Sequence, residues 1–94
     1  MSLELTIVTP LGEVFSGPVE SVVLPGSEGD FGVLPRHERL MTPLRVGEVE
    51  IRTSTGTKRA TISEGFADVS GSEVVVMVTS CRFEGEAREG ETRR

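Results

Sequence analysis

Apolar and polar residues alternate along most of the chain. Residues 3–7 place leucine or isoleucine at every second position, and in residues 46–52 Val49 and Ile51 share one face while charged residues share the other. Residues 73–79 form the most apolar run, and its valines are β-branched. Since successive side chains of a strand point to opposite faces, this period of two predicts half-buried strands.

Glycine and proline divide the chain into short segments. The eleven glycines and five prolines are spread between the alternating runs, which is typical of turns and not of a helical bundle. About nine short strands separated by turns predict an all-β fold, an antiparallel β-sandwich or barrel. We expect the strand 58–63 to continue into 65–69, after a glycine bulge. The expected core includes Val74, Val76 and Val78, together with the Phe66 side of the preceding strand.

Two segments depart from the alternating pattern. Residues 26–32 carry a glycine at every third position, which predicts a shaped, exposed loop. Residues 36–45 show no clear period and predict one helical turn or a winding edge segment.

Length and charge set the domain organisation. Ninety-four residues suffice for one domain. We expect that domain to span residues 1–83. Residues 84–94 are almost entirely charged and predict a flexible tail or a short helix.

Composition excludes several classes of function. A net charge of −5 and few aromatic residues are unlike a general nucleic-acid binder. One cysteine cannot form an intrachain disulfide, and one cysteine with one histidine cannot supply a usual zinc site. No apolar run approaches the ~20 residues of a membrane-spanning helix. We therefore expect a soluble, cytosolic protein without metal, cofactor or direct membrane insertion.

The acidic residues Glu28 and Asp30 stand in the glycine-rich segment. Their charge argues against phosphate binding, and an exposed loop cannot separate two pKa values as a catalytic carboxylate pair requires. Two interpretations stay open, which are a solvated surface and a docking surface for basic groups of a partner.

His37 is the only histidine. A nucleophilic triad needs a serine or cysteine beside it in space, and Cys81 is distant in sequence. We therefore predict no catalytic residue, although a small hydrolase that uses His37 stays open as an alternative. His37 could instead lie in an interface, where the neighbouring Leu40 and Met41 would supply apolar contact area.

Several motifs together resemble the epsilon subunit of the F-type ATP synthase. The resemblance covers roughly residues 3–80, and its most specific part is a GSEG segment followed by a glycine and by P-x-H. The matching segments are FSG (15–17), VESVVLP (19–25), GSEGDFGVLPRH (26–37), ISEGFADV (62–69) and VVV (74–76).

The resemblance implies a β-sandwich of two about five-stranded sheets. It also implies a non-catalytic subunit of the central stalk, which binds the gamma subunit and the ring of c subunits and couples proton transport to ATP synthesis. Such a complex would hold the chain peripherally at the cytoplasmic face of the bacterial inner membrane. The alternative is a free-standing β-sandwich module that regulates another complex through protein–protein contacts.

Site residues follow from the same resemblance. The ring-facing loop corresponds to Glu28, Gly29 and Asp30. The gamma-facing surface corresponds to Thr9, His37 and Thr42, to which we add Leu40 and Met41 because they are apolar and adjacent.

Two departures from the family pattern change the expectation. This chain has Arg36, Glu38 and Arg39 where relatives have glycine, alanine and proline around the histidine, so we expect a partner with compensating charges. The helical hairpin that follows the sandwich in relatives has no counterpart here, and with it we expect no nucleotide site.

Overall fold

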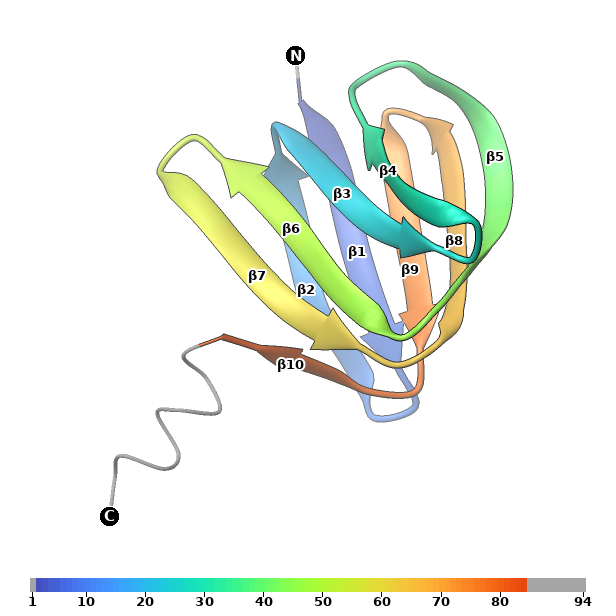
Figure 1. The fold of residues 1–94 in the computed structure, drawn as a ribbon. Coiled ribbons are helices and arrows are strands. Elements are labelled where there is room, and N and C mark those ends of the chain that lie inside the picture. The colour runs from blue at the N-terminus through green and yellow to red at the C-terminus, as the bar shows by residue number, and fades with distance from the viewer. Residues whose placement is uncertain (1, 85–94) are drawn as a thin grey trace.

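The computed structural model describes residues 2–84, which form ten strands (Figure 1). Apart from Glu84, the predicted charged tail lies outside the described residues. The strands are β1 (Leu3–Thr9), β2 (Gly12–Val19), β3 (Ser21–Gly26), β4 (Gly29–Val33), β5 (His37–Leu44), β6 (Gly47–Thr53), β7 (Gly56–Ile62), β8 (Gly65–Gly71), β9 (Glu73–Val78) and β10 (Cys81–Phe83).

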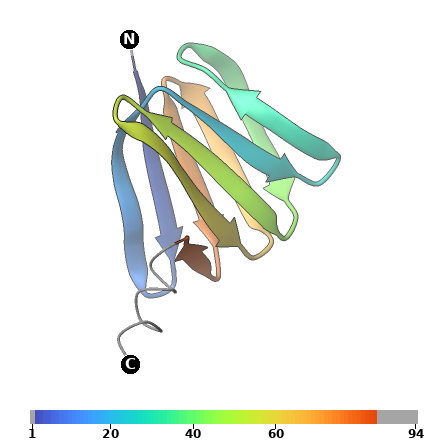
Figure 2. The same cartoon turned by 60° about the vertical axis from the view of Figure 1, so that its left-hand side comes forward.

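The strands lie in two layers (Figure 2). The β6 layer has the order β4-β3-β6-β7-β10, and the β9 layer has the order β5-β8-β9-β1-β2. The layers join where Gly26 pairs with Leu44, and Phe15 of β2 stacks on Phe83 of β10 with 5.9 Å between the ring centroids. The predicted sandwich of two five-stranded sheets is confirmed, with one parallel pair, β1 and β9, among antiparallel pairs.

The core lies between the layers and consists of aliphatic side chains. Leu5 and Ile7 of β1 are fully buried, and the parallel register sets them opposite Val74 and Val76. Among residues 2–84, no polar or charged side chain is buried. Each square ångström of apolar surface removed from water stabilises the fold by about 25 cal/mol, so these alternating positions carry most of the stability.

The glycine-rich segment is a β-hairpin, so the prediction of a loop over residues 26–32 is wrong for most of its length. β3 ends at Gly26 and β4 begins at Gly29, which leaves only two residues in the turn. A Cβ at Gly26 would lie 2.7 Å from the Gly29 carbonyl oxygen and 2.9 Å from the Phe31 ring. The glycines therefore allow close approach within the hairpin, rather than a free loop.

Residues 36–45 contain the edge strand β5, so of the two predicted alternatives the winding edge segment is confirmed and the helical turn is wrong. β5 pairs with β8, and its register shifts between His37 and Leu40. Hydrogen bonds to β8 fix the extended backbone, although the charged residues in this segment hide the alternation in the sequence.

The predicted continuation of the strand 58–63 into 65–69 is also wrong. β7 belongs to the β6 layer and β8 to the β9 layer, so the chain crosses between layers at residues 63–64. The Ser63 hydroxyl accepts hydrogen bonds from the backbone N–H groups of Thr79 (2.9 Å) and Ser80 (3.1 Å) at this crossing. A Cβ at Gly65 would overlap the Met77 carbonyl oxygen, so β8 can approach β9 only with glycine here.

Candidate partner-binding surfaces

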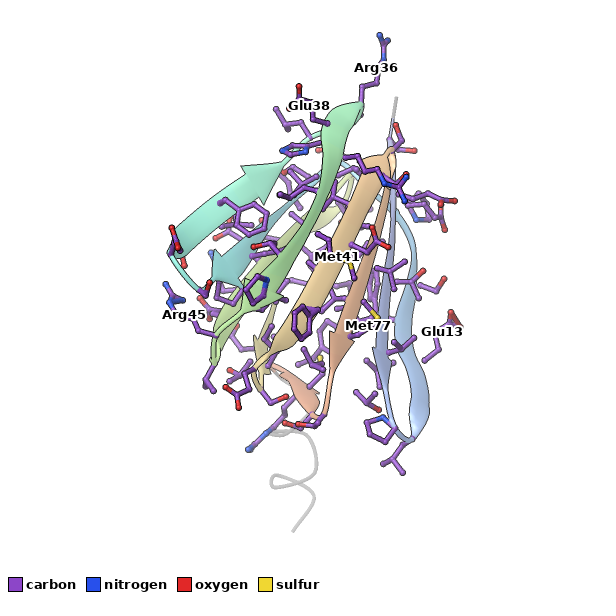
Figure 3. All side chains as sticks on the ribbon, turned by 90° about the vertical axis from the view of Figure 1, so that its right-hand side faces the viewer. Glu13, Arg36, Glu38, Met41, Arg45 and Met77 are labelled. Carbon is purple, nitrogen blue, oxygen red and sulfur yellow. The ribbon has the colours of Figure 1, made fainter. Side chains whose placement is uncertain are left out.

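The outer face of the β9 layer carries exposed apolar side chains. Met41 is 62% exposed and Phe66 is 52% exposed. Strand register aligns Pro43, Phe66, Met77 and Val8 in a row across four strands, and Figure 3 shows Met41 and Met77 in the middle of this face. We call this surface the apolar face. Its apolar residues are Val8, Met41, Pro43, Phe66, Val75 and Met77.

Phe66 is a correction to the sequence prediction, which assigned its side to the core. Ala67 and Val69 are fully buried, so the alternate residues Phe66 and Asp68 point outward. The alternation shows which residues share a face, but Phe66 is more apolar than Ala67 and suggested the opposite orientation. One sequence signal could have predicted this orientation. The β-branched Val69 lies two residues after Ala67 and therefore on the same face of β8.

Thr9 borders the apolar face. A shallow depression of about 320 Å³ lies where β1 ends, and Val8, Thr9 and Met77 line it. The Thr9 hydroxyl also accepts a hydrogen bond of 3.2 Å from the backbone N–H of Leu11, which holds the turn into β2.

The residues predicted to face the gamma subunit do not form one cluster. Met41 lies on the apolar face, whereas Leu40 packs against the core and Thr42 pairs with a buried residue of β8. His37 pairs with the last residue of β8, and Thr9 ends β1 at the opposite end of the layer. Only Met41 and Thr9 therefore lie on or beside the apolar face.

Charged residues surround the apex above the apolar face (Figure 3). Arg36 has a φ of +68°, a left-handed conformation that favours glycine, and its backbone N–H donates a 3.2 Å hydrogen bond to the Ser72 hydroxyl. The Arg39 guanidinium donates a 3.3 Å hydrogen bond to the Ser70 hydroxyl. Glu38 lies at the register shift of β5, so the three departures from the family pattern gather at one corner.

The tip of the β3–β4 hairpin holds the residues predicted to face the c-ring. Asp30 pairs with Arg45 at 2.7 Å, and the two side chains are 63% and 45% exposed. Glu28 is exposed in the turn, and no described residue forms an ion pair with it. Gly29 has a φ of +135°, so its backbone shapes the turn.

The outer face of the β6 layer is charged. Glu50 lies 3.3 Å from Arg52 and 3.6 Å from Arg59. Val49 and Ile51 are fully buried, so the predicted orientation of the alternating strand 46–52 is confirmed. We call this surface the charged face.

The described residues offer no catalytic or metal-binding cluster. Cys81 lines a depression of about 500 Å³ with Ser63 and Ser80 on the β6 layer, whereas His37 lies at the apex of the β9 layer. Within residues 2–84, no three histidine, cysteine, aspartate or glutamate side chains are grouped as metal ligands. The same residues include no helix that is long and apolar enough to cross a membrane.

Comparisons with known proteins agree with this fold. An ATP synthase epsilon chain from Helicobacter acinonychis is 43% identical over 81 residues, which cover 86% of this chain and 66% of the relative. One from Campylobacter fetus is 45% identical over 78 residues, which cover 82% of this chain and 60% of the relative. The chain thus spans about two thirds of the length of these relatives, or slightly less.

Solved structures give the same architecture. A chain in the Euglena gracilis mitochondrial ATP synthase, solved with its OSCP, F1 and c-ring parts, aligns over 98% of this chain and 60% of its own length, with a TM-score of 0.84 and 25% identity. A chain in the central stalk and c-ring structure of the Tetrahymena thermophila enzyme aligns over 86% of this chain and 66% of its own, with a TM-score of 0.71 and 16% identity. Residues 2–84 match the family described as the β-sandwich domain of the ATP synthase delta/epsilon chain, and the chain belongs to that family.

Proposed function

We propose that the chain is a non-catalytic subunit of the central stalk of an F-type ATP synthase. It joins the gamma subunit to the c-ring and thereby helps to couple proton transport to ATP synthesis. Family membership and the epsilon-chain relatives support this role. Within the complex, the subunit lies peripherally at the cytoplasmic face of a bacterial inner membrane.

The apolar face is the observation that carries the proposal. A folded domain rarely leaves several large apolar side chains together on one sheet face, and such patches mark protein–protein contacts. Met41 and Phe66 are both more than half exposed, and strand register joins Phe66 to Met77. Covering this face removes apolar surface from water and stabilises the complex, which fits a permanent place beside gamma.

The remaining predicted contacts fit around this face. The ring-facing residues Glu28 and Gly29, with Asp30, lie on the hairpin tip, which projects from the β6 layer, so one domain can hold two partners at once. His37 lies at the charged apex of the same layer, away from the apolar face. Leu40 and Thr42 support β5 from the inner side rather than contribute contact area.

A binding experiment with paired variants tests the gamma contact. The full chain and its Phe66→Glu variant are each mixed with the cognate gamma subunit, and complex formation is measured by calorimetry. We expect Phe66→Glu to weaken binding at least tenfold, because a buried unpaired carboxylate costs more than 1.4 kcal/mol.

Thr61→Glu on the charged face is the matched control, since it also replaces a neutral, outward side chain by one carboxylate. It should bind gamma as the unaltered chain does. Equal binding by all three proteins contradicts the assignment of the apolar face, and no binding by the unaltered chain favours a module that serves another complex.

A further inference from the structure

Two arginines, Arg36 and Arg39, stand at the upper end of β5, and we call them the basic corner. The Arg39 guanidinium donates its 3.3 Å hydrogen bond to the Ser70 hydroxyl of β8. Because Val69 is fully buried, the neighbouring Ser70 points outward. Arg39 therefore lies on the same side of the layer as Met41, two residues later on β5, and the basic corner borders the apolar face.

Arg36 occupies the turn before β5 in a backbone conformation that suits glycine better. Its φ is +68°, where a residue with a Cβ is strained, and its backbone N–H donates a 3.2 Å hydrogen bond to the Ser72 hydroxyl. Figure 3 shows its exposed side chain at the top of the molecule, with Glu38 apart from it on the β4 side. Strained residues of this kind cluster at functional sites, so an exposed arginine here points to a contact with a partner.

The β8–β9 hairpin holds both arginines. Gly71 has a φ of +63° in the turn, and Ser70 and Ser72 on either side of it accept the two hydrogen bonds. Within residues 2–84, the bond to Ser70 uses one of the five N–H donors of the Arg39 guanidinium, and the others can meet a carboxylate. An arginine that is already held in place loses less conformational entropy when it binds.

The opposite end of the same outward row is acidic. Glu73 of β9 pairs in register with Ser70 on one side and with Glu4 of β1 on the other. Both glutamates are exposed, and neither forms an ion pair with any residue between 2 and 84. A carboxylate of a partner is therefore attracted over β5 and repelled over β9 and β1, so the row accepts an acidic partner group at one end only.

We propose that the basic corner binds an acidic patch of the gamma subunit and fixes the orientation in which gamma covers the apolar face. This inference rests on the proposed function, in which gamma covers that face. Burial of apolar surface attracts the partner but has no direction, so it does not select one orientation. The separated charges at the upper border do select one, because the wrong orientation brings like charges together.

The test uses the full chain and calorimetric titration with the cognate gamma subunit at several salt concentrations. Arg36→Gly removes the side chain and relieves the left-handed backbone. We expect its unfolding temperature to be at least as high as that of the unaltered chain, whereas gamma binding weakens about fivefold and depends less on salt. We expect Arg39→Gln to weaken gamma binding by a similar factor. A purely structural role would not weaken binding in a variant whose stability is kept.

Arg82→Gln is the matched control, since Arg82 is exposed on β10 and this variant has the same net charge as Arg39→Gln. It should bind gamma as the unaltered chain does. Arg39→Glu combined with Glu73→Arg reverses the charges of the row without changing the net charge. We expect this double variant to weaken gamma binding at least tenfold. Thermal unfolding identifies a variant that has lost its fold, and the single variants decide if the double variant fails to fold.

The outcomes separate this inference from the proposed function. If the folded Arg36→Gly and Arg39→Gln variants, or the folded double variant, bind gamma within about twofold of the unaltered chain, the basic corner has no orienting role and the stalk role stands. Equal weakening by Arg82→Gln also overturns the inference, because the effect would then come from net charge. An unaltered chain that does not bind gamma overturns both the gamma contact and this inference.

Discussion

The two outer faces of the sandwich are built on the same strand geometry but carry different chemistry. The charged face holds Glu50 between Arg52 and Arg59, while the apolar face exposes Met41 and Phe66. Both layers bury their inward residues equally well. The inward positions therefore specify the fold, whereas the outward positions decide which layer meets a partner.

The largest expected effect comes from breaking the packing beneath the apolar face. Gly65→Ala puts a Cβ against the Met77 carbonyl oxygen, so β8 must move away from β9. We expect the free energy of unfolding in urea to fall by about 3 kcal/mol, since the opposing atom is backbone and cannot rotate away. Gly17→Ala is the control, because a Cβ there has no neighbour within 4 Å, and a comparable loss in both variants would contradict the steric argument.

A smaller effect separates the two sides of β8. Val69→Ala empties part of the core and should lower the free energy of unfolding by about 2 kcal/mol, whereas Phe66→Ala, half exposed, should lower it by about 1 kcal/mol or less.

Binding to gamma should reverse this order for the same two variants. Phe66→Ala should weaken binding to the gamma subunit, whereas Val69→Ala, if it is folded, should bind gamma as the unaltered chain does. If one of the two variants lost more than the other in both unfolding stability and gamma binding, the inward and outward residues of β8 would not have separate roles.

The smallest effect is expected on the charged face. Glu50→Gln removes two partly exposed ion pairs, which should cost about 0.5 kcal/mol in thermal unfolding and less in high salt. Binding to gamma should not change. A weakened gamma complex in this variant would mean that the charged face also takes part in the contact.

Much of the fold could be predicted from the alternation of residue types. Leu5 and Ile7 on β1, and Val49 with Ile51 on β6, are buried as their spacing indicates. The sequence does not distinguish the glycine-rich hairpin from a loop, because glycine permits both a flexible turn and close contact with an aromatic ring. The distinction depends on the Phe31 ring, which packs over Gly26 at the end of β3.

The partner surfaces were less predictable. β5 gains its extended form from β8, whose paired residues lie 21 to 34 positions later, and a local pattern cannot report such pairing. The sequence predicts Leu40 beside Met41 as contact area, but adjacent residues of a strand point to opposite sides, and Leu40 packs against the core. The pairing of Asp30 with Arg45, which follows β5 fifteen residues later, has no local signal in the sequence.

The parallel pairing of β1 with β9 has a consequence for synthesis of the chain. β1 is synthesised well before β9 and must wait until residue 78 is available before its central partner can form. Until then its leucine and isoleucine side chains have only β2 as a neighbour within their layer, and such unsatisfied apolar strands are prone to aggregate. Folding of the sandwich therefore cannot be completed before β9 has been synthesised, and chains shortened before residue 78 should fail to become soluble.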